Sequence, residues 1–377
     1  MKFNTKCVHG GGKPDSTGAI SPAIYMSSTF THPGLGETTG FQYTRESNPT
    51  RDRLETLIAG LEEGTDAIAF SSGMAAVDAV FHLFSPGDHV ILGDDLYGGS
   101  IRLFTNIYEK NGVEFTYVGT SDLDTVQAAF KPNTKAVYIE TPTNPMMEIT
   151  DVRALSKMAH DRNALVIVDN TFLSPYFQKP LHLGADIVVH SGTKFIGGHH
   201  DVISGFTIVK DDDLAAQLRL IYKTVGACLS AFDSWLVIRG IKTLALRMEQ
   251  HQKNAIALAE WLKQEPKVTK VLFPGLPDHP GYEVNKSQTT GFGGMLSFEV
   301  DSEETAKQVL EGIQLIQFAE SLGGTESLLT YPVTQTHPDL KPEDAERKGI
   351  TRRLLRLSVG IEDTDDLIAD LAQAFNK

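Results

Sequence analysis

The sequence predicts an α/β protein in which helices cover both faces of a mostly parallel central sheet, followed by a smaller C-terminal α+β domain. Short apolar strands that alternate with amphipathic helices are typical of a buried parallel sheet. Six apolar runs alternate with helical patterns in this way, at 89–92, 115–118, 136–139, 165–168, 187–189 and 206–209. After Pro266 the pattern changes, and strands are expected at 295–300 and 355–359 with a helix near 302–312 between them.

Three parts are expected along the chain. Residues 1–48 are rich in Gly, Ser, Thr and Pro and show little periodicity, so they are expected to form an extended arm. Pro49 then begins a helix, since proline is favoured at the first helical position. The larger domain is expected to span 49–245 and the C-terminal domain 246–377, with a long helical stretch at about 230–264 across their boundary.

Composition and charge exclude several classes of protein. The chain has 377 residues and a formal net charge of −14 at pH 7, so no nucleic-acid surface is expected, because phosphate binding needs clustered cations. Cys7 and Cys228 are the only cysteines and lack metal-ligand spacing, so no disulfide framework or metal site is expected, and a cytoplasmic location fits. No apolar run reaches membrane-spanning length, and the first residues lack the apolar core of a signal peptide.

A lysine and an aspartate are expected to meet at one edge of the sheet. Lys194 follows the apolar run 187–189, and Asp169 ends the run 165–168. Ligands bind at the carboxyl ends of the strands in such sheets. The two residues fit pyridoxal phosphate (PLP), which a lysine amine binds as a Schiff base and whose ring nitrogen needs an acid beside it. On these residues alone, an exposed ion-pair lysine and a helix-capping aspartate remain open.

Three further features could contact this cofactor or its substrate. Ser72-Gly73-Met74 begins a helical pattern, where free N–H groups favour an anion, although an ordinary helix cap is the alternative. Tyr97 precedes two glycines and could stack on a planar ring or be a half-buried surface tyrosine. Arg356 lies within an apolar strand and needs an anionic partner, either a structural acid or a substrate carboxylate.

Taken together, these motifs resemble the Cys/Met-metabolism family of PLP enzymes, over essentially the whole chain. The matching segments are Tyr43-Thr44-Arg45, Asn48-Pro49-Thr50, Ser72-Gly73-Met74, Tyr97-Gly98-Gly99, Glu140-Thr141-Pro142-Thr143-Asn144-Pro145, Asp169-Asn170-Thr171, Ser191-Gly192-Thr193-Lys194, Ser321-Leu322-Gly323-Gly324 and Arg356-Leu357-Ser358-Val359-Gly360. The resemblance implies PLP fold type I, the fold of aspartate aminotransferase.

The resemblance also implies a role for each matching residue. Lys194 is implied to hold the cofactor covalently, Asp169 to pair with its ring nitrogen, and Tyr97 to stack on the ring and move protons. The residues implied to bind the cofactor are Tyr43, Arg45, Gly73, Met74, Tyr97, Asp169, Thr171, Ser191, Thr193 and Lys194. The residues implied to bind the small amino-acid substrate are Asn144, Glu320, Ser321 and Arg356.

The resemblance implies that the chain associates with further copies of itself. Tyr43 and Arg45 of the arm are implied to reach the cofactor phosphate of a neighbouring subunit, so the expected assembly is a homotetramer, a dimer of dimers with shared active sites. Two positions depart from the family pattern. Gln42 stands where an acid is common in cystathionine enzymes, which leaves recognition of the distal amino group open, and His200 stands where a small serine is common.

Members of this family form or cleave C–S bonds at the β or γ carbon. Glu320 resembles γ-synthases and γ-lyases, whereas many β-lyases have an uncharged residue there. Segments 36–49 and 330–337 look most like bacterial cystathionine γ-synthases that also act as O-acetylhomoserine thiolyases. The expected reaction is therefore γ-replacement of O-acyl-homoserine by cysteine, with cystathionine γ-lyase as the first alternative and β-lyase as the second. A PLP-binding regulator without catalysis is disfavoured, because the implied catalytic residues are present.

Overall fold

The computed structural model describes residues 1–338 and 342–376, and the central sheet has the predicted α/β form. The sheet has seven strands in the order β1-β7-β6-β5-β4-β2-β3. All neighbouring strands are parallel except β7, which runs antiparallel to β6 and β1. The strands are β1 (Asp66–Phe70), β2 (His89–Gly93), β3 (Glu114–Val118), β4 (Thr134–Glu140), β5 (Leu165–Asp169), β6 (Ile187–Ser191) and β7 (Gly205–Val209).

Helices cover both faces of this sheet, as the alternating pattern predicts. One face is packed by α3 (Gly73–Phe81), α4 (Gly98–Leu103), the π-helix η1 (Phe104–Tyr108) and α9 (Asp212–Val225). The other face is packed by α2 (Pro49–Glu62), α5 (Leu123–Ala128), α6 (Val152–His160), α7 (Ser174–Phe177) and α8 (Pro180–Leu183). The strands are consequently buried on both sides, which explains why they consist of almost uninterrupted apolar runs.

The C-terminal part has a second sheet of its own, with the order β10-β11-β12-β9-β8. Its elements are β8 (Val268–Leu272), α12 (Tyr282–Gln288), β9 (Met295–Val300), α13 (Glu303–Gly312), β10 (Gln317–Phe318), β11 (Leu328–Thr330), α14 (Pro342–Arg347), β12 (Leu354–Ser358) and α15 (Thr364–Phe375). A separate core forms beneath it, where Leu258 and Leu262 meet Phe298, Leu355 and Phe375.

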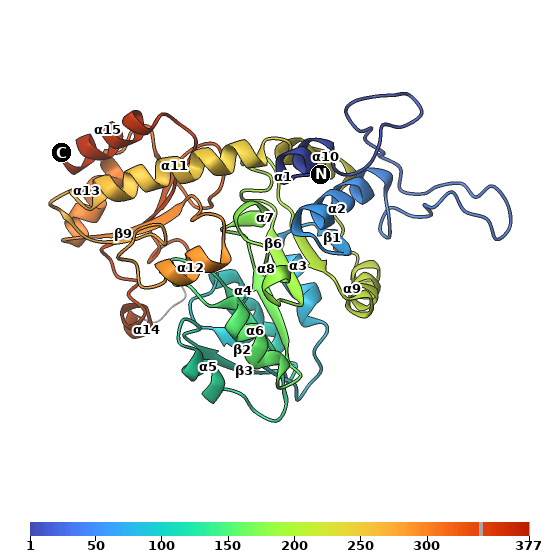
Figure 1. Cartoon of the computed structure of the whole chain (residues 1–377), viewed down its shortest axis with the longest axis horizontal. Helices are drawn as coiled ribbons and strands as arrows, with labels where there is room; N and C mark the ends of the chain where they lie inside the picture. The colour runs from blue at the N-terminus through green and yellow to red at the C-terminus, as the bar shows by residue number, and fades with distance from the viewer. Residues whose placement is uncertain (339–341, 377) are drawn as a thin grey trace.

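The expected long helix is in fact two helices, α10 (Ala231–Ile241) and α11 (Leu244–Leu262). The chain turns at Lys242 and Thr243 between them, and α11 then extends from the larger domain over the C-terminal sheet (Figure 1). Because α11 packs with both parts of the molecule, it connects them without a flexible linker.

The N-terminal segment departs from the expectation at its start. Residues 3–9 form a helix, α1 (Phe3–His9), that packs on α2 and α11 and buries Cys7. The prediction of an extended conformation is therefore wrong for these residues, because contact with two other helices stabilises a short helix whose own sequence is a weak signal. Residues 10–48 contain no helix or strand and project from the body of the molecule as open loops (Figure 1).

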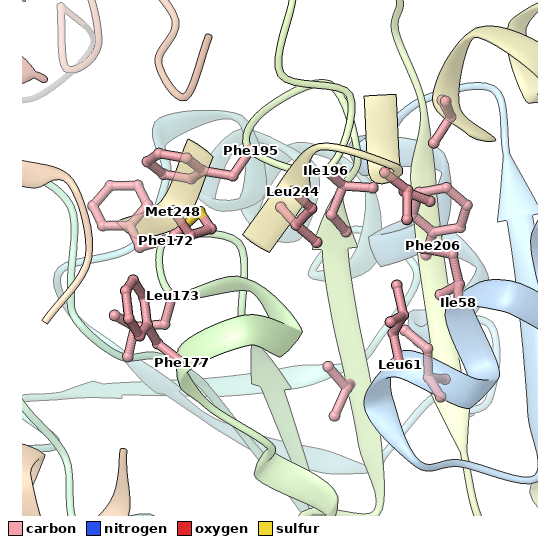
Figure 2. Packing of buried hydrophobic residues seen from close by; sticks show 14 of the residues in the cluster. Ile58, Leu61, Phe172, Leu173, Phe177, Phe195, Ile196, Phe206, Leu244 and Met248 are labelled. Carbon is pink, nitrogen blue, oxygen red and sulfur yellow. The ribbon is translucent and has the colours of Figure 1, made fainter. Parts of the chain in front are cut away.

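A hydrophobic cluster anchors the segment that carries Lys194. Phe195 and Ile196 follow this lysine and pack with Leu244 and Met248 of α11, while Phe206 of β7 joins the same cluster (Figure 2). Gly240 lets α10 approach closely, because a Cβ there would overlap the backbone oxygen of Gly197. The Lys194 segment is therefore held by buried packing on both sides.

Two further findings concern membrane-spanning helices and metal sites. None of the helices in residues 1–338 and 342–376 is long and apolar enough to cross a membrane. Over the same residues, no group of three or more His, Cys, Asp or Glu side chains is arranged to hold a metal ion.

Candidate active site

A cavity of about 360 Å³ lies at the carboxyl ends of β4, β5 and β6 and is closed on one side by the C-terminal part. Its size is in the range of sites for small ligands. All but two of the site residues expected from the sequence line it, namely Gly73, Met74, Tyr97, Asn144, Asp169, Thr171, Ser191, Thr193, Lys194, Glu320, Ser321 and Arg356. Segments nearly 300 residues apart thus meet at the sheet edge where ligands of α/β proteins bind.

Tyr43 and Arg45 are the two expected residues that do not line the cavity of their own chain. Tyr43 is exposed, and the Arg45 guanidinium lies 5.5 Å from the centre of its ring. Arg45 also donates a hydrogen bond to the backbone oxygen of Lys223. Both residues belong to the projecting arm and are separated from the cavity.

Lys194 presents its amine to the cavity without an acidic partner. Its Nζ donates to Ser321 Oγ at 2.7 Å, and no ion pair of Lys194 occurs within the described residues. Burial and, less strongly, the Arg356 charge lower the pKa of this amine to about 8, and the Glu320 charge opposes the shift. About a tenth of Lys194 is therefore a neutral amine at pH 7, far more than for an ordinary lysine, and this is the form that attacks a carbonyl carbon.

Asp169 is held at the end of β5 by a network on its Oδ1 atom. The backbone N–H and the hydroxyl of Thr171 donate to it at 3.0 and 2.5 Å, and the Thr171 hydroxyl accepts from the Ser191 N–H at 2.9 Å. Burial raises the pKa of the Asp169 carboxyl, and the Thr171 hydrogen bonds oppose that rise. The carboxyl thus has a fixed orientation and space for a cationic partner in the cavity, which fits a protonated ring nitrogen.

The beginning of α3 offers a site for an anion beside Lys194. Ser72 caps the helix by accepting from the Ala75 N–H at 3.1 Å, and the N–H groups of Gly73 and Met74 in the first turn have no partner within the helix. Gly73 is needed here because a Cβ would come within 2.9 Å of Ser191 Cβ. These donors and the hydroxyls of Ser191 and Thr193 border the cavity, so the residues present fit a phosphate group.

Arg356 has no acidic partner among the described residues, although it is only 2% exposed. It donates to Asn144 Oδ1 at 2.8 Å, to the backbone oxygen of Ser321 at 3.0 Å and to Thr330 Oγ1 at 3.2 Å, and its Nε atom finds no partner in the part of the chain that the structure describes. Burial lowers its pKa to about 10. Of the two partners open from the sequence, a structural acid is thus absent, which favours a carboxylate bound in the cavity.

Helix α11 contacts the backbone on both sides of the cavity. Arg247 donates to the backbone oxygens of Phe195 and Gly240 at 2.7 and 2.9 Å, which fixes the segment after Lys194. One turn further along, His251 Nδ1 is 2.7 Å from the backbone oxygen of Val359, and Asn254 donates to that of Gly360 at 3.1 Å. These carbonyls lie just beyond β12, which carries Arg356.

Several cavity residues were not assigned a role from the sequence. They are Ser72, Val77, Ser100, Arg102, Glu140, Pro142, Phe172, Ile203, Leu322, Gln335 and Thr336. Glu140 had a usable signal, because it ends the apolar run 136–139 in the way that Asp169 ends the run 165–168. Gln335 and Thr336 lie in segment 330–337, which resembles γ-synthases, but the sequence did not place them at the cavity because their position depends on the fold of the C-terminal part.

Comparisons with known proteins agree with this geometry. The sequence profile of the family described as Cys/Met metabolism PLP-dependent enzyme matches residues 4–376. The chain is 48% identical over 376 residues to cystathionine β-lyase of Lactococcus lactis subsp. cremoris, covering 100% of this chain and 99% of that protein. It is 49% identical over 375 residues to cystathionine γ-synthase of Haemophilus influenzae, covering 99% of this chain and 97% of that protein.

A solved structure extends the likeness to three dimensions. The crystal structure of cystathionine γ-lyase from Lactobacillus plantarum complexed with L-serine matches with a TM-score of 0.98 at 47% identity, covering 100% of this chain and 99% of that chain. The likeness spans both sheets and the cavity between them. The predicted fold and cofactor are confirmed, and this chain belongs to the Cys/Met-metabolism family of PLP-dependent enzymes.

Proposed function

We propose that this protein is a cystathionine γ-synthase, which replaces the acyl-oxygen substituent at the γ carbon of O-acyl-homoserine by the thiol of cysteine. The observation that carries this proposal is Glu320, which lines the cavity beside Lys194 and Arg356 and has no ion-pair partner among the described residues. A free carboxylate there attracts the ammonium group of a second amino acid, and cysteine must bring such a group to the γ carbon.

The chain's own residues divide the remaining tasks. Arg356 and Asn144 are proposed to bind the α-carboxylate of the substrate, and the start of α3 the cofactor phosphate. PLP, when bound, supplies the electron sink that stabilises negative charge at the substrate Cα. Lys194 Nζ is proposed to take the proton from Cα and to move protons at Cβ, so that the γ substituent can leave. Tyr97, 44% exposed at the cavity wall, is proposed to stack on the ring.

Cystathionine γ-lyase is the second candidate. The fold match to the Lactobacillus plantarum γ-lyase favours it, and the named relatives differ in activity at nearly equal identity. The choice of the synthase is supported by the segment at 330–337, whose sequence resembles γ-synthases and which contributes Gln335 and Thr336 to the cavity wall.

One assay separates these reactions. The purified enzyme is given either cystathionine alone or O-acetylhomoserine together with cysteine, and the products are identified. Faster formation of cystathionine in the second mixture supports the synthase. Faster release of cysteine and 2-oxobutanoate from cystathionine would instead make the protein a γ-lyase, and homocysteine with pyruvate a β-lyase.

Replacement of Glu320 tests the choice of the γ carbon. Glu320→Gln keeps the shape but removes the charge, so kcat/KM for the γ reaction is expected to fall about 10- to 100-fold, the worth of one charged hydrogen bond. The β reaction should fall less. Cysteine release and homocysteine release from cystathionine measure the two reactions, and Glu311→Gln on the exposed side of α13 is the control. Equal losses in both products would mean that Glu320 does not select the bond.

We also propose that Tyr43 and Arg45 complete the phosphate site of a neighbouring subunit in a homotetramer built as a dimer of dimers. Ile20, Met26 and Leu35 of the projecting arm are 84, 75 and 106% exposed, which is unusual for apolar side chains unless another surface covers them. An arm that lies across a second copy would bury these residues and bring Arg45 to its cavity.

A mixing experiment tests the shared site. Lys194→Ala and Arg45→Ala are each expected to be inactive alone, whereas a mixed dimer has one site that carries neither change. After subunit exchange at equal amounts, about a quarter of the wild-type activity should return, because half of the dimers are mixed and each has one intact site. A lack of recovery, with exchange demonstrated by two different tags, would place Arg45 in the site of its own chain.

A further inference from the structure

Glu140 and Asp169 are two carboxyl groups that stand side by side in the cavity. They are the last residues of the neighbouring parallel strands β4 and β5, and they occupy paired positions in the strand register. Side chains at paired positions of parallel strands point to the same face of the sheet. Both residues accordingly line the cavity, and Glu140 is only 7% exposed.

No cation within the described residues forms an ion pair with Glu140. The titratable groups that act on it are Asp169 on β5 and Asp95 in the segment before α4, while Tyr138 lies on β4 itself. Burial and the Asp169 charge raise the pKa of Glu140 well above its usual range. Two adjacent buried carboxylates cannot both ionise without a large cost, so at least one holds a proton.

The hydrogen bonds of Glu140 and Asp169 indicate which of the two carboxyl groups holds the proton. Asp169 accepts two hydrogen bonds from Thr171, and the nearby His190 also favours its ionised form. Within the described residues, Glu140 accepts one hydrogen bond, from the backbone N–H of Tyr97 to its Oε1 atom at 2.9 Å. A carboxyl with more donors is the better anion, so the proton belongs on Glu140.

We propose that Glu140 is a neutral carboxylic acid in the working enzyme, and that in this form it positions Tyr97 while leaving Asp169 as the single anion beside the cofactor ring. Its Oε1 holds the Tyr97 backbone at the turn where α4 begins, and its Oε2 carries the proton. A second negative charge next to Asp169 would raise the pKa of Asp169 and favour its protonated form, which cannot pair with a protonated ring nitrogen. Glu140 is thus a positioning residue. The inference rests on the proposed role of Asp169 but not on which C–S bond reacts.

Two substitutions test whether the Glu140 carboxyl is neutral or charged in the folded enzyme. Glu140→Gln keeps an oxygen acceptor for the Tyr97 N–H without a charge, so the holoenzyme should retain turnover within about tenfold of wild type. Glu140→Ala removes the acceptor and should lose about 100-fold or more, with an altered visible circular dichroism of the cofactor as its contact with Tyr97 changes. If Glu140→Gln loses as much as Glu140→Ala, the neutral form is wrong.

Infrared spectroscopy provides a readout that is independent of turnover. The difference spectrum of wild type minus Glu140→Gln should contain the carbonyl stretch of a protonated carboxylic acid. That of wild type minus Glu311→Gln should lack this stretch and contain the bands of an ionised carboxylate, and both spectra contain the amide bands of the new glutamine with opposite sign. Carboxylate bands in the first spectrum would overturn the proposal. This outcome is distinct from failure of the Asp169 role, which would leave the protonated Glu140 band in place while Asp169→Asn remained active.

The pH dependence of thermal unfolding provides a further test of whether Glu140 is protonated in the folded protein. A group whose folded pKa is raised above its unfolded value loses stability as pH rises, because unfolding then releases the proton. The Tm of Glu140→Gln relative to wild type should therefore increase as the pH rises above about 5, the usual range of a free carboxyl, since the variant has no proton to release. A constant difference across this range would contradict a neutral Glu140.

Discussion

Lys194→Ala is expected to remove the visible absorption band of the lysine-bound cofactor and to lower turnover at least about a thousandfold, the scale of losing a nucleophile and general base together. The Lys194 Nζ is the single primary amine found in the described wall of the cavity, and its partner Ser321 offers only a hydroxyl. The loss should appear in kcat, because the proposed contacts of Arg356 and Asn144 with the substrate remain.

The matched control is Lys253→Ala, which removes an exposed lysine of α11 outside the cavity and should leave both the band and turnover unchanged. Circular dichroism in the far ultraviolet would show that both variants are folded. Normal turnover in Lys194→Ala, or an unchanged visible band, would show that the cofactor is held by another group.

Asp169→Asn is expected to slow removal of the substrate α-proton by a few hundredfold, about 3 kcal/mol in a site that excludes water. Asparagine has nearly the same shape and keeps an oxygen for the two Thr171 donors, so the change removes the charge and little else. Without that charge the ring nitrogen would lose the partner proposed to keep it protonated, and the cofactor would become a weaker electron sink.

Exchange of the α-proton with solvent deuterium, followed by NMR, measures this step apart from C–S chemistry. Asp161→Asn serves as the control, since Asp161 is exposed, lies outside the cavity and forms a surface ion pair with Lys157 of α6. An unchanged exchange rate in Asp169→Asn would remove Asp169 from the catalytic residues, and the proposal for Glu140 would then lose its basis.

The sequence predicted the structure best for strands that are buried on both faces. Strands such as β5 and β6 are covered on both faces, so their apolar runs marked both the strands and the polar residues that end them. Asp169 and Lys194 could therefore be placed at one sheet edge, and Gly73 at the start of a helix. Arg356 was visible for the same reason, as a charge within an apolar strand.

Features that depend on distant packing could not be predicted in this way. Helix α1 forms through contacts with α2 and α11, and the turn at Thr243 between α10 and α11 has no proline or adjacent glycine to mark it. The short strands β10 and β11 have two and three residues, too few to show a period. Glu140 lies next to Asp169 because β4 and β5 are neighbours in the sheet, and the order of strands in a sheet cannot be predicted from the apolar runs alone.

The contacts of α11 imply a fixed distance between the two groups that are proposed to bind the amino-acid end of the substrate. One rigid helix sets the separation between the amine at Lys194 and the guanidinium at Arg356, because Arg247 and His251 brace the two sides from adjacent turns. Arg356 is proposed to hold the carboxylate of any α-amino acid at this spacing, whatever its side chain. Variation at the far end of the pocket would then leave the scaffold unchanged, and relatives that share about half of their residues with this chain do bear different reaction names.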